Sequence, residues 1–373
     1  MFEEVLNPSS PVFWLIILFI LGAVCLFIAR TFRTYVRFIY PNAKYEAIGN
    51  PFIQEKELNV LVENTDLTTF KDRVNVLRDY HIEGQTASSI QQSFDQHFLD
   101  TIMMMRNESP KKLHAFYDLY LQKIDFYLVK NGIKQILRGN NKRQLMESAL
   151  LPQTKELLGR LQDTSKEDLP HLLASYGFTE ELLGEIAKET PDFLHLDVLF
   201  DKQFVYQLKE LQVPQKCETA KQDFIKNMID MLTIKHLLRV KQLSYPLDAC
   251  KTLFLGEGKQ ISRWRFDQMA DGADVSGVIT ALEGTSYFPA VSSKMEQYTK
   301  EKSVQVFETS IDSVFLQRIR EISLQNYLTF GPSLRFLVSK EFEIRNLKAI
   351  AKGLAEDLSA DMITKYLVKE VSL

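Results

Sequence analysis

The chain has 373 residues, of which 45% are hydrophobic and 25% are charged, and its formal net charge is −3. This length and composition are typical of a folded protein of two or three domains and exclude a largely disordered chain. The small negative charge lacks the strong basic field of nucleic-acid-binding proteins, so no nucleic-acid partner is expected.

The first predicted element is an apolar helix near the amino end. Residues 12–29 form an eighteen-residue run without a charged side chain. As a helix this run would span roughly 27 Å, close to the thickness of the hydrocarbon core of a bilayer. Two glutamates precede it and three arginines follow it, which favours an uncleaved anchor over a signal peptide and leaves a buried core helix as the alternative. The residues expected to form the anchor are Val12, Trp14, Leu18, Gly22, Leu26, Ala29, Arg30 and Arg33.

A basic and aromatic segment, residues 30–40, follows the apolar run and suits the headgroup layer of a membrane. Pro41 is expected to end the helix there, so that residues 1–40 form an anchor with a short tether. The distribution of arginines predicts a single-pass protein of the cell membrane, with lipid contacts through residues 12–29 and the bulk of the chain in the cytoplasm.

After Pro41 the hydrophobic pattern is helical throughout, and sustained alternation is missing, so the predicted fold class is all-α. Apolar residues recur at three- and four-residue spacing, and capping residues such as Asp66 and Ser359 mark helix starts. The expected helices cover residues 66–80, 87–106, 110–139, 192–213, 215–240, 261–282 (broken at 271–272), 303–330, 340–352 and 359–368, with short helices between 150 and 189.

One helical motif occurs three times, at Ile133–Arg138, Ile234–Arg239 and Leu347–Lys352. Each copy reads aliphatic, Lys, any residue, aliphatic, small or Leu, basic, and the copies start 101 and 113 residues apart. On a helix, the aliphatic positions share one face and the two cations share a polar flank.

Shorter similar segments, 66–80, 166–176 and 273–287, precede the three motifs. The chain is therefore predicted to contain three helical repeats, 41–150, 151–257 and 258–373. These repeats would bury their apolar faces by packing around a common axis.

With these elements assigned, the chain resembles the C subunit of archaeal and bacterial A/V-type rotary ATPases, the counterpart of the d subunit of eukaryotic V-ATPases. Three segments carry the resemblance, namely Tyr40–Ile48 (YPNAKYEAI), Ile136–Gly139 (ILRG) and Glu343–Ile350 (EIRNLKAI), and it covers about residues 40–373. It implies a funnel of three related helical bundles around a pseudo-threefold axis.

In that family the funnel caps the rotating proteolipid ring on its cytoplasmic side and receives the lower end of the central stalk. The resemblance therefore implies two sets of partners, the proteolipid ring and the central-stalk subunits, and a mechanical role in passing torque. The amino-terminal anchor departs from the family's usual pattern. A helix attached to a rotor part must rotate with the ring, so the ring's central opening is its expected place.

The motifs of catalytic and cofactor sites are missing from the sequence. Gly256–Gln260 (GEGKQ) lacks the spacing and the hydroxyl of a phosphate loop, and no His-Glu-x-x-His, Cys-x-x-Cys or Gly-x-Ser-x-Gly motif occurs. Cys25 lies inside the apolar run, and Cys217 and Cys250 are expected to be reduced thiols. No catalytic, cofactor or metal site and no small-molecule substrate is predicted, and the chain is not expected to be an enzyme.

Six cations from the repeated motif are candidates for the stalk or ring interface: Lys134, Arg138, Lys235, Arg239, Lys348 and Lys352. They could meet acidic residues of the stalk and contribute steering and register. The alternative is a solvated helix flank whose cations pair with neighbouring acids.

The functional prediction is a non-catalytic central-stalk coupling subunit of an A/V-type ATPase, which serves ion-transport-coupled ATP synthesis or hydrolysis. The alternative is a membrane-anchored helical adaptor, unrelated to a rotor, that binds peptide partners on a concave face.

Overall fold

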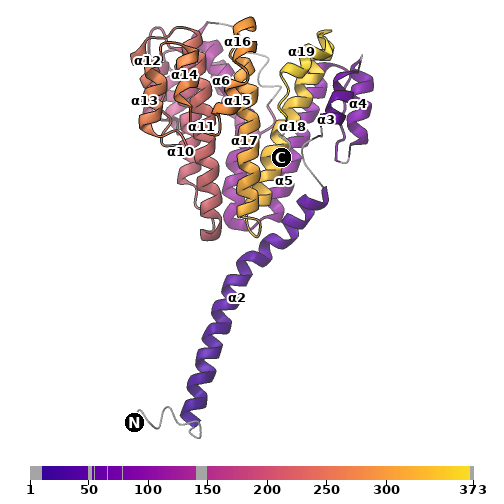
Figure 1. The fold of residues 1–373 in the computed structure, drawn as a ribbon, viewed down its shortest axis with the longest axis vertical. Coiled ribbons are helices and arrows are strands. Elements are labelled where there is room, and N and C mark those ends of the chain that lie inside the picture. Colours follow the sequence, from indigo (N-terminus) through magenta and orange to yellow (C-terminus); the bar gives the residue numbers. More distant parts are fainter. Residues whose placement is uncertain are drawn as a thin grey trace.

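The computed structural model describes residues 11–48, 53, 55–64, 66–77, 79–139 and 149–369, and these contain eighteen α-helices, two short 3₁₀ segments and no strand. The predicted all-α class is confirmed. One long helix, α2 (Pro11–Ile48), projects from an otherwise compact helical body (Figure 1).

Six long helices form the body, arranged as three hairpins. They are α5 (Ala87–Glu108) with α6 (His114–Leu137), α10 (Phe193–Glu210) with α11 (Glu218–Gln242), and α17 (Gln305–Gln325) with α18 (Gly331–Ala355). Each helix packs against the next in this order, and α18 packs back against α5. The six helices therefore close into a cycle rather than forming an open stack.

Clusters of short helices fill the chain between the hairpins. They are α3 (Glu55–Val62) and α4 (Leu67–Val76); α7 (Pro152–Gln162), α8 (Leu169–Ser175) and α9 (Glu180–Ile186); and α12 (Leu247–Lys251), α13 (Arg263–Asp271), α14 (Val275–Ala281), α15 (Phe288–Ser292) and α16 (Met295–Glu301), with α19 (Ala360–Lys365) at the carboxyl end. Each cluster packs against the second helix of one hairpin: α7 against α6, α14 against α11 and α4 against α18. Because the hairpins form a cycle, the last hairpin supports the first cluster.

The buried apolar side chains fall into two groups. The larger core connects all three hairpins. The smaller core joins the second half of α6 to α7, α8, α9 and the start of α10. The contact between the first and second hairpins therefore depends in part on a core of its own.

Aromatic side chains close the end of the body from which α2 leaves. The ring of Phe116 on α6 lies 4.9 Å from that of Phe330 before α18 and 6.2 Å from that of Phe224 on α11, in edge-to-face arrangements. Nearby, the Asn42 side chain of α2 donates to the carbonyls of Tyr327 and Thr329, each at 3.0 Å. These contacts fix the exit of α2 against the α17–α18 turn.

The expectation about Pro41 was wrong, and the start of the helix expected at 340–352 was placed too late. Pro41 lies inside α2 instead of ending it, because Asn42 is bonded to the body and Tyr45 stacks on Phe336 at 4.9 Å, and these contacts offset the missing backbone hydrogen bond. Pro332 lies in the first turn of α18, where its missing N–H costs nothing, so the helix begins at Gly331. The third motif therefore belongs to a helix that begins nine residues earlier than expected.

Other predicted boundaries agree with the structure. Asp66 caps α4 by accepting from the Thr69 N–H, and Ser359 caps α19 in the same way from Met362. The segment 261–282 is broken after Asp271. The capping residues in the sequence therefore located these helix starts correctly.

Candidate functional site

Each of the three repeated motifs places its lysine against an aspartate on the first long helix of the next hairpin. The pairs are Lys134–Asp197 at 2.7 Å between α6 and α10, Lys235–Asp312 between α11 and α17, and Lys348–Asp95 at 2.7 Å between α18 and α5. The third pair joins the last hairpin to the first. Equivalent ion pairs therefore occur at all three junctions of the cycle.

The second cation of each motif has a different environment. The Arg138 guanidinium lies 4.5 Å from the centre of the Phe193 ring. Arg239 donates two hydrogen bonds of 2.7 Å to the Glu308 carboxylate. The Lys352 side chain is 66% exposed, and its nearest acid is 3.8 Å away on its own helix. Arg138 and Lys352 are thus the most exposed of the six predicted interface cations.

The aspartates belong to a second repeat that the sequence analysis missed. They occur in Phe94–Phe98 (FDQHF), Leu196–Phe200 (LDVLF) and Ile311–Phe315 (IDSVF). Asp95, Asp197 and Asp312 are 102 and 115 residues apart, close to the intervals of the basic motif. Each copy has an apolar residue, then Asp, then Phe three residues after the Asp. A single copy of this pattern is common in helices, and only its threefold recurrence is informative.

The junction between α11 and α17 is the most deeply buried of the three. Lys235 is 9% exposed and Asp312 is 3% exposed. Burial lowers the pKa of Lys235, and the Asp312 carboxylate opposes that change. Arg345 on α18 donates to the other oxygen of Asp312 at 2.5 Å. One carboxylate therefore compensates two cations from two different helices.

A cavity of about 460 Å³ lies between α5, α6 and α18. Glu341 faces it and accepts from Tyr120 and, at 2.6 Å, from Lys123. Arg345 and Lys348 also line the cavity. The lining combines side chains of both charges with a mostly apolar surface, which suits an amphipathic protein segment.

Buried acids on the second hairpin helices hold the loops that lead into the short-helix clusters. Asp125 on α6 accepts from the Leu151 N–H at 2.7 Å, and Asp230 on α11 accepts from the Ile261 N–H at 2.9 Å. Burial raises the pKa of Asp230 to about 6, although backbone donors oppose the change. The glycines of the 256–260 segment have a structural role here, because a Cβ at Gly258 would lie 1.8 Å from Asp230 Oδ1.

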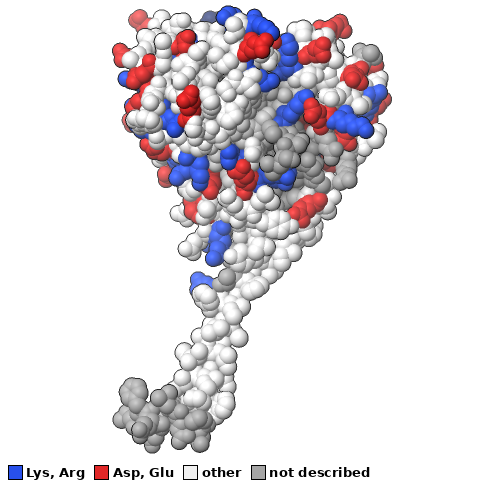
Figure 2. Space-filling view, viewed as in Figure 1, with Lys and Arg blue, Asp and Glu red and all other residues white. Residues whose placement is uncertain are grey.

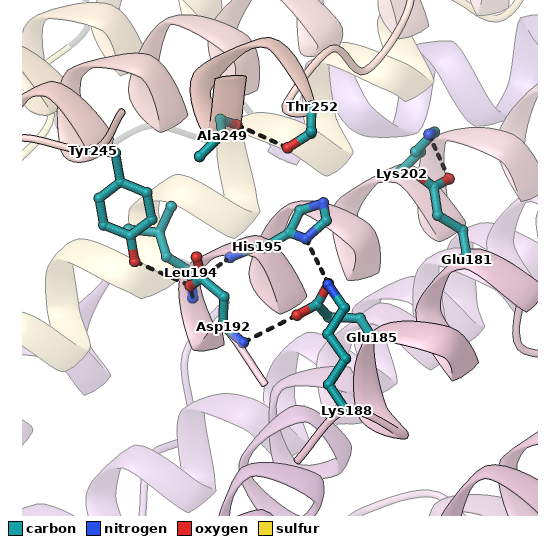
Figure 3. A network of polar contacts seen from close by, with 10 residues as sticks. All are labelled: Glu181, Glu185, Lys188, Asp192, Leu194, His195, Lys202, Tyr245, Ala249 and Thr252. Atoms are coloured by element: carbon teal, nitrogen blue, oxygen red, sulfur yellow. Dashed lines mark hydrogen bonds and ion pairs between the residues drawn. The ribbon is translucent and has the colours of Figure 1, made fainter. Parts of the chain in front are cut away.

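A polar network positions the start of α10 (Figure 3). The Asp192 carboxylate caps this helix and also accepts from the Tyr245 hydroxyl at 3.0 Å, which ties α10 to the loop after α11. His195 Nδ1 lies 2.8 Å from Glu185. Burial alone would raise the pKa of Glu185, but hydrogen bonds from Lys188, the Asp192 N–H and His195 lower it. The network orients the turn that carries Phe193 beneath Arg138.

The predicted anchor residues all lie on α2, and all of them are exposed. Leu18 and Leu26 are 70% and 74% exposed, and no atom lies within 4 Å of a Cβ built on Gly22. Val12, Trp14, Ala29, Arg30 and Arg33 are likewise exposed. The helix is long and apolar enough to cross a membrane, and its most apolar window is not buried in the body. This exposure disagrees with the alternative of a buried core helix.

Within the described part of the chain, no group of three or more His, Cys, Asp or Glu side chains has the arrangement of a metal site. Cys217 and Cys250 are buried free thiols and Cys25 is exposed.

Comparison with known proteins identifies the family of the chain. Residues 41–366 match the model of a family described as ATP synthase (C/AC39) subunit. The chain is 26% identical to the C subunit of the A-type ATP synthase of Methanothermobacter thermautotrophicus over 339 residues, which cover 89% of this chain and 87% of the relative. It is 24% identical to the protein of the same name in Methanocaldococcus jannaschii (89% of this chain, 86% of the relative) and 24% identical to that of Pyrococcus furiosus (91% and 92%). The chain belongs to the ATP synthase (C/AC39) subunit family.

Proposed function

We propose that this chain is the non-catalytic coupling subunit of an A/V-type rotary ATPase, which links the rotor shaft to the membrane proteolipid ring and passes torque between them. Its family membership makes it a subunit of an A/V-type ATPase. The finer assignment is supported above all by the closed cycle of six long helices with an ion pair at each junction between hairpins. A closed cycle transmits a twisting load around its whole circumference, whereas an open stack would yield at its free edge.

The three repeats proposed from the sequence, 41–150, 151–257 and 258–373, each contain one long hairpin. The lysine of each repeat pairs with the aspartate of the next. This relation supports a pseudo-threefold funnel, in which the hairpin turns form the narrow end and the carboxyl ends of α6, α11 and α18 surround the mouth.

The proposed tether is the apolar part of α2. It leaves the body at the hairpin turns, and in Figure 2 it is uncharged over most of its length, with basic side chains only near the body. A helix inserted in the central opening of the proteolipid ring would raise the effective concentration of the funnel there. The complex is membrane-associated in this proposal, with the body on the cytoplasmic side.

The proposed stalk socket combines the cavity between α5, α6 and α18 with the exposed cations at the mouth. Lys134, Lys235, Arg239 and Lys348 each have an acid partner within the body. Arg138 and Lys352 are more available to an acidic partner, because both are exposed and the ion-pair partner of Lys352, Glu356, is itself exposed at 3.8 Å. We therefore assign the first contact with the stalk to these two cations.

Purification in mild detergent tests the coupling role. The full chain, carrying an affinity tag, should co-purify with a proteolipid ring and with small stalk subunits of its own cell. A monodisperse single chain that binds neither would favour the membrane-anchored adaptor instead.

Charge reversal tests the socket. The double variant Arg138→Glu/Lys352→Glu should bind stalk subunits about tenfold more weakly at low salt, and the difference should fade in about 1 M salt, where charges are screened. The matched control is Lys111→Glu/Lys226→Glu, which reverses two exposed lysines nearer the hairpin turns. If the double variant and the control bound stalk subunits with equal affinity, the assignment of the socket to Arg138 and Lys352 would be contradicted, while the coupling role would be unaffected.

A further inference from the structure

A second cavity, of about 560 Å³, lies where α2 meets the hairpin turns. Two of its walls come from α2, through Arg30 and Arg37. Opposite them are Lys112 after α5 and Lys216 before α11. Four cations from three separate segments therefore face one cavity, and its lining contains no acidic residue.

None of these four cations makes an ion pair with a residue that the structure describes. The acids nearest in sequence to Lys112 and Lys216 have other partners, since Glu108 binds Lys44 and Glu218 lies 3.0 Å from Lys221. Like charges held together without a counter-ion repel one another. An anionic group in the cavity would relieve this repulsion and would gain from all four cations at once.

The position of the cavity along α2 indicates the kind of anion. Its lining extends from Phe27, inside the apolar run, to Phe38, which is buried against the body. At about 1.5 Å per residue these two positions are roughly 16 Å apart along the helix. Arg30, the first charged residue after the run, lies between them, so the cavity would straddle the boundary between hydrocarbon and headgroups.

The remaining walls are apolar or neutral. Pro110, Pro214 and the two phenylalanines offer apolar surface, and Gln215 offers an amide. A free phosphate would use only the cations, whereas a phospholipid would use the cations for its phosphate and the apolar walls for its glycerol and upper acyl carbons. We propose that this cavity binds the headgroup of one anionic phospholipid, which joins α2 to the turns before α6 and α11. The inference rests on the proposed membrane tether.

The test uses the full-length protein in neutral detergent micelles, titrated with a short-chain phosphatidylglycerol and followed by native mass spectrometry. Wild type should bind one molecule more tightly than short-chain phosphatidylcholine. The variant Lys112→Gln/Lys216→Gln should lose at least tenfold in affinity for phosphatidylglycerol, because each cation near an anionic lipid surface is worth about fivefold.

The matched control is Lys111→Gln/Lys226→Gln, which removes the same charge from lysines that do not line the cavity. An equal loss in this control would reduce the effect to general surface charge and overturn the proposal. Inorganic phosphate that competes as well as the phospholipid would indicate a free-anion site and also overturn it. So would a cavity variant that binds lipid normally but no longer co-purifies with the ring, because the cations would then recognise protein.

Failure of the tether can be recognised separately. If alkaline carbonate extracted the wild-type protein from native membranes, α2 would not be inserted in the bilayer, and the proposed tether on which the inference rests would be contradicted. Lipid binding in micelles does not require insertion into a bilayer, so loss of binding there counts against the cavity alone.

Discussion

The buried junction between α11 and α17 gives the sharpest test of how the helix cycle is held together. In the variant Asp312→Ala, Lys235 would lose its acid partner while remaining almost wholly buried, and Arg345 would lose its carboxylate as well. Removing one member of a buried ion pair typically costs about 3–5 kcal/mol, because the remaining charge is left uncompensated. For a body of roughly 330 residues, with an unfolding entropy of about 2.1 cal/mol/K per residue, this corresponds to a fall in Tm of about 4–7 °C.

The measurement is thermal unfolding of the full chain in detergent, followed by circular dichroism. The control Glu356→Ala removes the partner of the exposed Lys352, where the two charged atoms are 3.8 Å apart, and its Tm should change by less than about 1 °C. A second variant, Lys235→Met/Asp312→Leu, removes both charges and should recover most of the lost stability. The reasoning fails if Asp312→Ala unfolds within 1 °C of the wild type, or if the double variant is as unstable as the single one.

Three further outcomes follow from the same contacts. Gly258→Ala should destabilise the body by about 2 kcal/mol or more, because the new Cβ would collide with the Asp230 carboxylate. Gly184→Ala, on α9 with no atom near the new Cβ, should stabilise the body by about 0.5–1 kcal/mol. Thermal melting curves of the two variants test both values. Burial alone would raise the pKa of Asp79, but hydrogen bonds and charge from His97 and Lys340 lower it to about 2 from 3.8. Ionised Asp79 should therefore contribute about 2 kcal/mol to the free energy of unfolding above pH 4, and this contribution should be lost as the pH falls toward 2. The difference in Tm between the wild type and Asp79→Asn should shrink over that range. The smaller core predicts that amides of α7, α8 and α9 exchange with deuterium before those of α17 and α18, and uniform exchange would contradict it.

The sequence predicted the elements of this fold better than the contacts between them. Helix starts were located correctly at Asp66 and Ser359, because a capping side chain bonds to backbone only two or three residues away and local sequence contains both partners. The persistence of α2 through Pro41 was missed for the opposite reason. The contacts that hold that helix come from Tyr327, Thr329 and Phe336, almost 300 residues along the chain.

The sequence analysis identified the cations of the candidate site but not their aspartate partners. The basic motif is easy to recognise, because two cations four residues apart and two aliphatic residues three apart define a pattern six residues long. Its acidic counterpart is a single Asp among apolar residues, and it pairs with a lysine of another hairpin, as Asp95 does with Lys348. Neither the partner nor its distance can be derived from a helix considered alone. The interface role of the six cations remains a prediction.

The ion pairs at the three junctions are better explained as determinants of register than as sources of stability. A buried ion pair contributes little more than well-packed apolar residues of the same volume, because desolvation offsets most of the attraction. The three hairpins are similar amphipathic units, and purely apolar junctions between them would tolerate sliding. A slip of one helical turn, about 5.4 Å, would break both the Lys134–Asp197 pair and the Lys130–Asp201 pair between α6 and α10, and at most one new pair could form among these four partly buried charges. The ion pairs at each junction therefore penalise displaced arrangements of the cycle while adding little to the correct one, and the torque-passing role proposed above would require that penalty more than additional stability.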